Sequence, residues 1–227
     1  MKLITYSSPS HREMCERFVI ANGERAGFKS CEMFTAEQLC ETGKYNSPGF
    51  AEQMWLKLRC LAEIAIGERV CYVDADCILL PGLHDWCESW LSERDRLTIG
   101  FGNDVAELCM GTIVFEQSAE TIQWWRFLYQ LAWMTKLHDQ AALHGLRENS
   151  KQVPVNLDVL PNDVFANWAT HGEHSQKTWK GEELIVPIGV LCWHANFCVG
   201  VEDKIRMLEI VERAVDKTYL TNARTHA

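Results

Sequence analysis

Two aspartates separated by one residue are the side chains of this sequence most clearly suited to chemistry. Asp74 and Asp76 follow the apolar run at residues 70–73, and a second apolar run at residues 77–80 comes directly after them. Side chains two positions apart in extended backbone project to the same side, so these two carboxylates should converge on one point. Converging carboxylates repel one another unless a cation lies between them. We therefore expect Asp74 and Asp76 to hold a hard divalent cation, Mg²⁺ or Mn²⁺.

The aspartate pair is also compatible with a structural role and with a different class of enzyme. The pair could cap the turn after a buried strand, because an Asp-x-Asp triplet alone is common. Haloacid-dehalogenase-type phosphatases also carry such a triplet, but theirs ends the first strand and is followed by Gly-Thr or similar residues. Here the triplet lies well into the chain and precedes Cys77-Ile78. The apolar runs on both sides favour the metal-binding interpretation.

Strands and helices are expected to alternate along the chain, and they determine where the pair lies. The run before Asp74 is continuous and bounded by charge, as in a central strand buried on both faces. We expect strands over residues 3–7, 28–34, 70–73, 97–101, 112–115, 185–186 and 190–193, and helices over residues 10–26 and 50–66, from Ser118, after His138, and over residues 203–217. This alternation predicts an α/β sheet with helices on its faces.

Local hydrogen-bonding patterns indicate where two of the helices begin. Ser10 with Glu13 fits a capping box at the start of the first helix, which Gly27 would end. Thr35 with Gln38 fits a second capping box and predicts a further helix start. No repeat or obvious linker interrupts the pattern, so residues 1–227 are expected to form a single domain.

Composition excludes several classes of partner. With 22 basic and 31 acidic residues among 227, the net charge is −9, which disfavours binding of nucleic acid or an anionic membrane through bulk charge. An anionic ligand would need a local metal ion or a few placed cations. No run approaches the roughly eighteen apolar residues of a membrane span.

The cysteines and the start of the chain bear on its location. The ten cysteines are scattered without a close Cys-x-x-Cys pair, and most lie in apolar segments. They are therefore expected to be reduced thiols that pack as small apolar side chains. The first apolar run is too short for a signal peptide, so the expected location is the cytoplasm.

Several short motifs occur in an order that resembles a known family. They are Lys57 in the helix before the aspartates, Asp74-Ala75-Asp76, Gly111-Thr112-Ile113-Val114-Phe115, His138-Asp139-Gln140, Leu160-Pro161 with Phe165, and His194-Ala195-Asn196-Phe197 with Gly200 and Lys204. This series resembles GT-A-type glycosyltransferases, and within them the nucleotide-diphospho-sugar transferases. The chain departs from the family at residues 107–110, where relatives commonly carry an asparagine.

The resemblance implies a fold and an activity. The fold would be a single GT-A-like (Rossmann-like) α/β domain, with a mixed, mostly parallel central sheet flanked by helices. The activity would be metal-dependent transfer of a sugar from a nucleoside diphosphate sugar to an unknown acceptor, with retention. Two alternatives are open: a non-catalytic nucleotide-sugar-binding module, and a sugar nucleotidyltransferase. The second normally has a glycine-rich basic loop after the first strand, which residues 6–10 lack.

The resemblance also implies roles for individual residues. It assigns the metal to Asp74, Asp76 and His194, the nucleotide donor to Tyr6, Ser7, Lys57, Asp74, Asp76, Gly200 and Lys204, and assistance in catalysis to Asp139 and Gln140. Ordinary structural roles stand beside these: a core histidine, a solvated Lys57, a Lys204 paired with Glu202 or Glu209, and Asp139 as a helix cap. Trp179, in the polar segment at residues 171–183, is the tryptophan that we favour for stacking on a sugar.

Overall fold

A six-stranded sheet forms the centre of the molecule, with strand order β2-β1-β3-β6-β5-β7. The computed structural model describes residues 1–41, 44–104, 107–149, 154–171 and 178–225. The strands of this sheet are β1 (Lys2–Ser7), β2 (Cys31–Thr35), β3 (Arg69–Asp74), β5 (Thr98–Asp104), β6 (Glu107–Glu116) and β7 (Asn156–Val159). The apolar runs predicted as strands at residues 3–7 and 70–73 are therefore the neighbouring strands β1 and β3.

The sheet is mixed and mostly parallel, as the resemblance implied. β1 pairs in parallel with both β2 and β3, and β5 pairs in parallel with β7. β6 runs antiparallel between β3 and β5. The carboxyl ends of β1 and β3 consequently lie side by side at one edge of the sheet, which is where open α/β sheets bind ligands.

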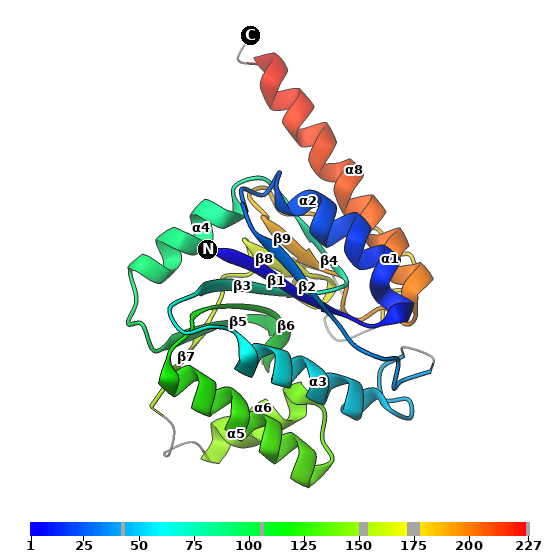
Figure 1. Cartoon of the computed structure of the whole chain (residues 1–227). Helices are drawn as coiled ribbons and strands as arrows, with labels where there is room; N and C mark the ends of the chain where they lie inside the picture. The colour runs from blue at the N-terminus through cyan, green and yellow to red at the C-terminus, as the bar shows by residue number, and fades with distance from the viewer. Residues whose placement is uncertain (42–43, 105–106, 150–153, 172–177, 226–227) are drawn as a thin grey trace.

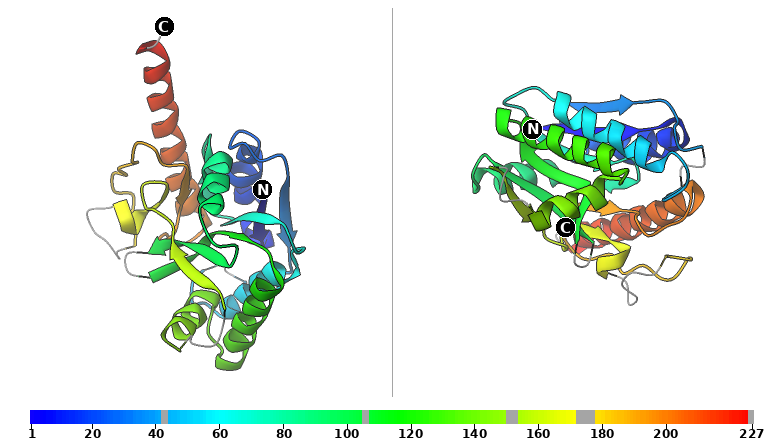
Figure 2. Two further views of the ribbon diagram at one scale, coloured as in Figure 1. Left: turned by 90° about the vertical axis from the view of Figure 1, so that its left-hand side faces the viewer. Right: turned by 90° about the horizontal axis from the view of Figure 1, so that it is seen from below.

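Helices cover both faces of this sheet (Figures 1 and 2). The helices are α1 (Arg12–Cys15) and α2 (Ala21–Gly23), within one helical segment over residues 9–23, then α3 (Phe50–Glu63), α4 (Leu83–Ser92), α5 (Ala119–Thr135), α6 (Asp139–Asn149), α7 (Trp168–His171) and α8 (Val201–Thr225). In Figure 1, α3, α5 and α6 lie on one side of the sheet, and α1, α2 and α4 on the other. The alternation of strand side chains accounts for this layering. Ile4 packs in a first core with side chains of α3 and α5, and its neighbour Leu3 packs in a second core with side chains of α1 and α4.

A second, three-stranded sheet lies against the first, with order β4-β9-β8. Its strands are β4 (Cys77–Leu79), β8 (Phe165–Asn167) and β9 (Cys192–His194). The turn at Ala75 and Asp76 joins β3 of the large sheet to β4 of the small one. The backbone carbonyl of Asp76 accepts a 2.8 Å hydrogen bond from the Ala195 amide, so this turn and the residue after β9 are held together.

Three predictions of local structure are wrong. Neither capping box forms: the first helical segment begins at Pro9, and Thr35 ends β2 instead of starting a helix. Ser10 and Gln38 instead bond to each other, because the Ser10 amide donates to Gln38 Oε1 at 2.9 Å. Residues 185–186 are not a strand. Val186 lies in irregular backbone and packs against a third core, formed by side chains of the small sheet and α8. Pro187, which follows it, has no amide hydrogen for a ladder.

All ten cysteines are free thiols in the structure, and most of them are buried. Within the described residues, every helix is too short or too polar to cross a membrane. The α8 helix spans 25 residues, and its C-terminal part extends away from the body of the molecule (Figures 1 and 2).

Candidate active site

A cavity of about 440 Å³ opens at the carboxyl ends of β1 and β3. Nine of the ten predicted site residues line it: Tyr6, Lys57, Asp74, Asp76, Asp139, Gln140, His194, Gly200 and Lys204. Ser7 does not line the cavity, because its side chain is buried and its hydroxyl donates to the Ser8 carbonyl at 3.2 Å; Ser8 lines the cavity in its place. Segments far apart in the chain therefore meet at one place.

Lys57 is the centre of the first charged cluster. Its Nζ atom lies 2.5 Å from Asp139 Oδ2 and 3.2 Å from Asp74 Oδ1, and it donates to the Met110 carbonyl at 3.2 Å. The side chain is buried, so the alternative of a solvated lysine is wrong. Burial acts to lower the pKa of Lys57, but the charges of Asp139 and Asp74 outweigh it and raise the pKa. Lys57 therefore stays protonated.

Asp139 is the buried partner in this cluster. Burial acts to raise its pKa, but the charge of Lys57 overcomes that effect and lowers the pKa to about 2. Its Oδ1 atom also accepts from the Gln140 amide at 2.9 Å, at the start of α6. Asp139 therefore lies at the start of a helix, as the structural alternative expected, and it also lies in the cavity wall.

Asp76 forms a second, separate charged cluster. Its Oδ2 lies 2.6 Å from Lys204 Nζ, and its Oδ1 lies 3.3 Å from His194 Nε2. Burial would raise the pKa of Asp76, yet Lys204 and His194 together hold it well below its ordinary value. Burial likewise acts to lower the pKa of His194, and the charge of Asp76 reverses this and raises it.

The two aspartates do not share one partner, contrary to the expectation from their spacing. Residues 75 and 76 form a turn, so the backbone is not extended and the rule for alternate side chains does not apply. Asp74 instead accepts from Lys57 and, at 2.6 Å, from the Tyr72 hydroxyl. Asp74 and Asp76 therefore pair with different basic side chains.

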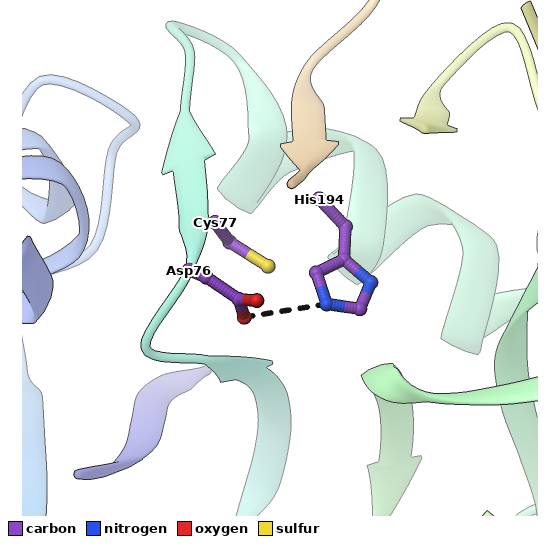
Figure 3. A group of neighbouring side chains, drawn as sticks. All are labelled: Asp76, Cys77 and His194. Carbon is purple, nitrogen blue, oxygen red and sulfur yellow. Dashed lines mark ion pairs between the residues drawn. The ribbon is translucent and has the colours of Figure 1, made fainter. Parts of the chain in front are cut away.

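Three side chains form a group that suits a metal ion. One ligand atom each from Asp76, Cys77 and His194 lies within 4.8 Å of the others, and all three residues are buried. Figure 3 shows the Cys77 sulfur directed toward the space between the carboxylate and the imidazole. Asp74, predicted as a ligand, is not in this group. Nothing in the sequence marked Cys77 as a metal ligand except its position next to Asp76.

Gly111 determines how close His194 can lie to the sheet. A Cβ atom at position 111 would lie 2.2 Å from Cε1 of the His194 ring, closer than any real contact. The other imidazole nitrogen, Nδ1, lies 3.5 Å from Cys109 Sγ. The glycine of the predicted motif therefore leaves room for the imidazole beside Asp76.

A polar network that the sequence did not predict forms another part of the wall. Asp104 Oδ1 accepts from Asn196 at 2.5 Å and from Asn167 at 2.9 Å, and Asp104 Oδ2 accepts from Gln140 at 3.3 Å. Asp104, Gln140 and Asn196 all line the cavity. The motif at residues 194–197 included Asn196, but nothing in the sequence connected it with Asp104, 92 positions away.

Trp179 is not positioned to stack on a sugar. Its side chain is only 1% exposed, and its indole Nε1 donates to the Glu182 carbonyl at 2.9 Å. It packs in the third core, beneath the guanidinium of Arg206 at 5.4 Å from the ring centre. A polar sequence neighbourhood thus misled the prediction, because the segment folds its one large apolar side chain inward.

Tyr6 and Gly200 lie at other positions in the cavity wall. The Tyr6 side chain is nearly buried at the end of β1 and receives a hydrogen bond from Gln53; its burial raises the pKa to about 12. Gly200 precedes α8 with a φ of 97°, a conformation that favours glycine, and its carbonyl accepts from the Lys204 amide at 3.3 Å.

Comparison with known proteins identifies the family and the fold. A family model described as nucleotide-diphospho-sugar transferase matches residues 24–208. No curated protein sequence matches the chain.

Solved structures similar to this chain include the following three. A glycosyltransferase involved in glycosylation of the major capsid of PBCV-1 is 11% identical, with 92% of this chain and all of that chain covered and a TM-score of 0.57. The galactosyltransferase LgtC, in complex with donor and acceptor sugar analogues, is 11% identical over 86% of this chain and 87% of that chain (TM-score 0.50). The glycosyltransferase GlyE of Streptococcus pneumoniae TIGR4, in its apo form, is 12% identical over 96% of this chain and 64% of that chain (TM-score 0.54). The predicted GT-A-type α/β fold is confirmed.

Proposed function

The chain belongs to the nucleotide-diphospho-sugar transferase family and is a glycosyltransferase, and from this premise we propose that its cavity binds a nucleoside diphosphate sugar with a divalent cation, Mn²⁺ or Mg²⁺. The observation that carries the proposal is the cluster of Asp76, His194 and Lys204 in the cavity wall. It offers an oxygen and a nitrogen for a metal beside a buried ammonium group. Such a cluster lets a protein of net charge −9 bind a small anion.

In this proposal Asp76 and His194 hold the cation, with Asp74 close by at the end of β3. A bound divalent cation stabilises the negative charge that develops on a leaving diphosphate. Lys204 contributes a second positive charge, since its Nζ atom is already held 2.6 Å from Asp76. Gly200 lines the cavity directly before α8 begins, and the start of a helix is a favourable position for a phosphate oxygen.

The Lys57 cluster and the Asp104 network face the transferred sugar in this proposal. Asp139 and Gln140 border it from the first turn of α6 and assist the transfer, which proceeds with retention. Lys57 keeps Asp139 ionised, and the Asp104 network orients the Gln140 amide. Tyr6 and Ser8 border the nucleoside, with Ser7 supporting the turn that carries Ser8. Retention is checked by NMR of the anomeric configuration of the product.

We also propose that the protein acts in the cytoplasm, and its ten free thiols support this location. Reducing compartments keep such thiols unpaired. Labelling of all ten with a thiol reagent after unfolding, in protein isolated under acid quench, would test this proposal.

A thermal-shift screen tests the donor class. Uridine, guanosine, cytidine and adenosine diphosphates are added with and without Mn²⁺, and one of them should raise Tm only with the metal present. Asp76→Asn should remove this metal-dependent shift. Asp85→Asn is the matched control, because that carboxylate is 90% exposed on α4. An unchanged shift in Asp76→Asn would contradict the metal role.

Turnover separates transfer from the two alternatives. The nucleotide sugar of the selected base should be hydrolysed slowly to free sugar and nucleoside diphosphate, with Mn²⁺ present. Binding without hydrolysis or transfer would indicate a non-catalytic module. Formation of nucleotide sugar from a sugar 1-phosphate and a nucleoside triphosphate would indicate a nucleotidyltransferase.

A further inference from the structure

Three aromatic rings form a cluster in the wall of the cavity. Tyr45 lies edge-on to Phe50 and to His138, with ring centres 5.2 and 5.4 Å apart, and Phe50 lies edge-on to His138 at 5.9 Å. The Tyr45 hydroxyl is 3.2 Å from His138 Nε2. All three residues line the cavity, and we refer to them as the aromatic triad. The roles proposed above do not use them.

The backbone that carries Phe50 and His138 is held in place. Phe50 is the first residue of α3, and Gly49 before it has a φ of 82°. A Cβ atom at position 49 would lie 2.0 Å from the Leu39 carbonyl oxygen, so only glycine fits there. Trp55 of α3 donates from Nε1 to the Leu137 carbonyl at 2.8 Å, directly before His138. The two segments that supply the rings are therefore tied together.

Tyr45 is unusually exposed for an aromatic side chain that lines a cavity. Its side chain is 65% exposed, while Tyr6 in the same cavity is 5% exposed. Among the described residues, the other large aromatic side chains with high exposure, Phe127 and Trp133, lie on α5 and do not line the cavity. Covering the Tyr45 ring with an apolar ligand surface would therefore gain free energy at this site.

Polar groups adjoin the aromatic triad on one side. His138 Nδ1 lies 3.6 Å from Asp139 Oδ1, and Gln140 follows with its amide bonded to Asp104. An apolar surface next to carboxylates and an amide matches a pyranose ring, which has an apolar C–H face and a rim of hydroxyls. The mutually edge-on rings leave no slot between parallel faces, so a ligand packs on one ring face and is not enclosed between two.

We propose that the aromatic triad is the binding subsite for the acceptor, and that the acceptor presents a pyranose ring whose apolar face packs on Tyr45. This inference rests on the proposed function, because it places the second sugar of the transfer reaction beside Asp139 and Gln140. Tyr45 is a specificity-determining residue in this scheme. Phe50 and His138 hold its ring in position.

Saturation-transfer NMR with simple glycosides tests the subsite. The probes are the methyl pyranosides of galactose, glucose, mannose and xylose, added with the nucleoside diphosphate and Mn²⁺ selected by the thermal-shift screen, and also without them. At least one glycoside should receive saturation from the protein. Tyr45→Ala should weaken its binding about tenfold, Tyr45→Phe should keep it within about threefold, and Phe127→Ala should leave it unchanged.

The outcomes separate this subsite from the donor site. The Kd of the nucleoside diphosphate should stay the same in Tyr45→Ala; a loss there, with glycoside binding intact, would make the aromatic triad a base platform and overturn the inference. Wild-type protein that binds none of the four glycosides, or equal glycoside binding in Tyr45→Ala, would also overturn it. Failure to bind any nucleoside diphosphate contradicts the proposed function alone, because the glycoside experiment without nucleotide still decides the subsite.

Discussion

Replacing Lys57 by methionine should destabilise the protein strongly. Methionine fills similar space but carries no charge, so the buried Asp139 would lose the ammonium group 2.5 Å away. The pKa of Asp139, about 2 instead of 3.8, corresponds to about 2 kcal/mol of stability at neutral pH. Lys57 also bonds Asp74 and the Met110 carbonyl, and loss of one partner of a buried pair typically costs about 3–5 kcal/mol. We therefore expect a loss of about 3–5 kcal/mol.

Urea unfolding at pH 7 measures this loss, and a double variant assigns its cause. Lys57→Met with Asp139→Asn removes both charges, so it should be about 1–3 kcal/mol more stable than the two single losses added together. Arg59→Met is the matched control on the same helix, because the Arg59 side chain is 56% exposed and its contact with Glu63 is 3.9 Å long. That control should change stability by less than about 0.5 kcal/mol.

Acid provides an independent check of the same pair. A carboxyl group with a lowered folded-state pKa stabilises the protein above its unfolded pKa of 3.8, and this stability is lost as the pH falls toward about 2. Wild-type stability should therefore fall between about pH 5 and pH 2 more steeply than that of Asp139→Asn. A cost below about 1 kcal/mol for Lys57→Met, or strict additivity with Asp139→Asn, would refute the ion-pair reasoning.

Three further predictions concern the metal group. Gly111→Ala should lower Mn²⁺ affinity about tenfold in calorimetric titration, because the new methyl group displaces the His194 ring; unchanged affinity would show that the ring is free to move. Co²⁺ bound by Asp76, Cys77 and His194 should show a near-ultraviolet thiolate charge-transfer band. Cys77→Ser should remove this band, and Cys71→Ser should keep it. A Co²⁺ complex without the band would exclude sulfur as a ligand. Mn²⁺ affinity should fall about tenfold per pH unit below the pKa of His194, because the imidazole must lose a proton to bind the metal. Asp76 raises this pKa in spite of burial. An affinity independent of pH between 5 and 8 would exclude His194 as a ligand.

The sequence predicted the strand that carries Asp74 and nine residues that line the cavity, because these depend on local pattern and motif order. It did not predict which charges pair. Lys57 lies 82 positions from Asp139, and Asp76 lies 128 positions from Lys204, so their contacts depend on how the elements pack. The turn at residues 75–76 also could not be recognised from an alternation of apolar and acidic residues.

The two capping boxes show why a local pattern can fail. Ser10 and Gln38 each belonged to a different predicted box, and in the structure they bond to each other across 28 positions. The Ser10 hydroxyl lies 2.8 Å from His11 Nδ1, and Gln38 Oε1 accepts from the Ser10 amide, so both side chains use partners other than those of the predicted boxes. The box of Ser118 and Thr121 does form at the start of α5, where both partners lie within one turn.

The turn between β3 and β4 divides the cavity into two parts that can change separately. Asp74 ends a strand of the large sheet and pairs with a side chain of α3, whereas Asp76 borders the small sheet and pairs with side chains of β9 and α8. Under the proposed roles, Asp76 and its partners on β9 and α8 bind the diphosphate, which all nucleoside diphosphate sugars share. Helices α3 and α6 border the donor sugar and the acceptor, which differ from one enzyme to another. Substitutions in α6 can then change the sugar without loss of the diphosphate site. Insertion of a residue into this turn would instead misalign both parts at once.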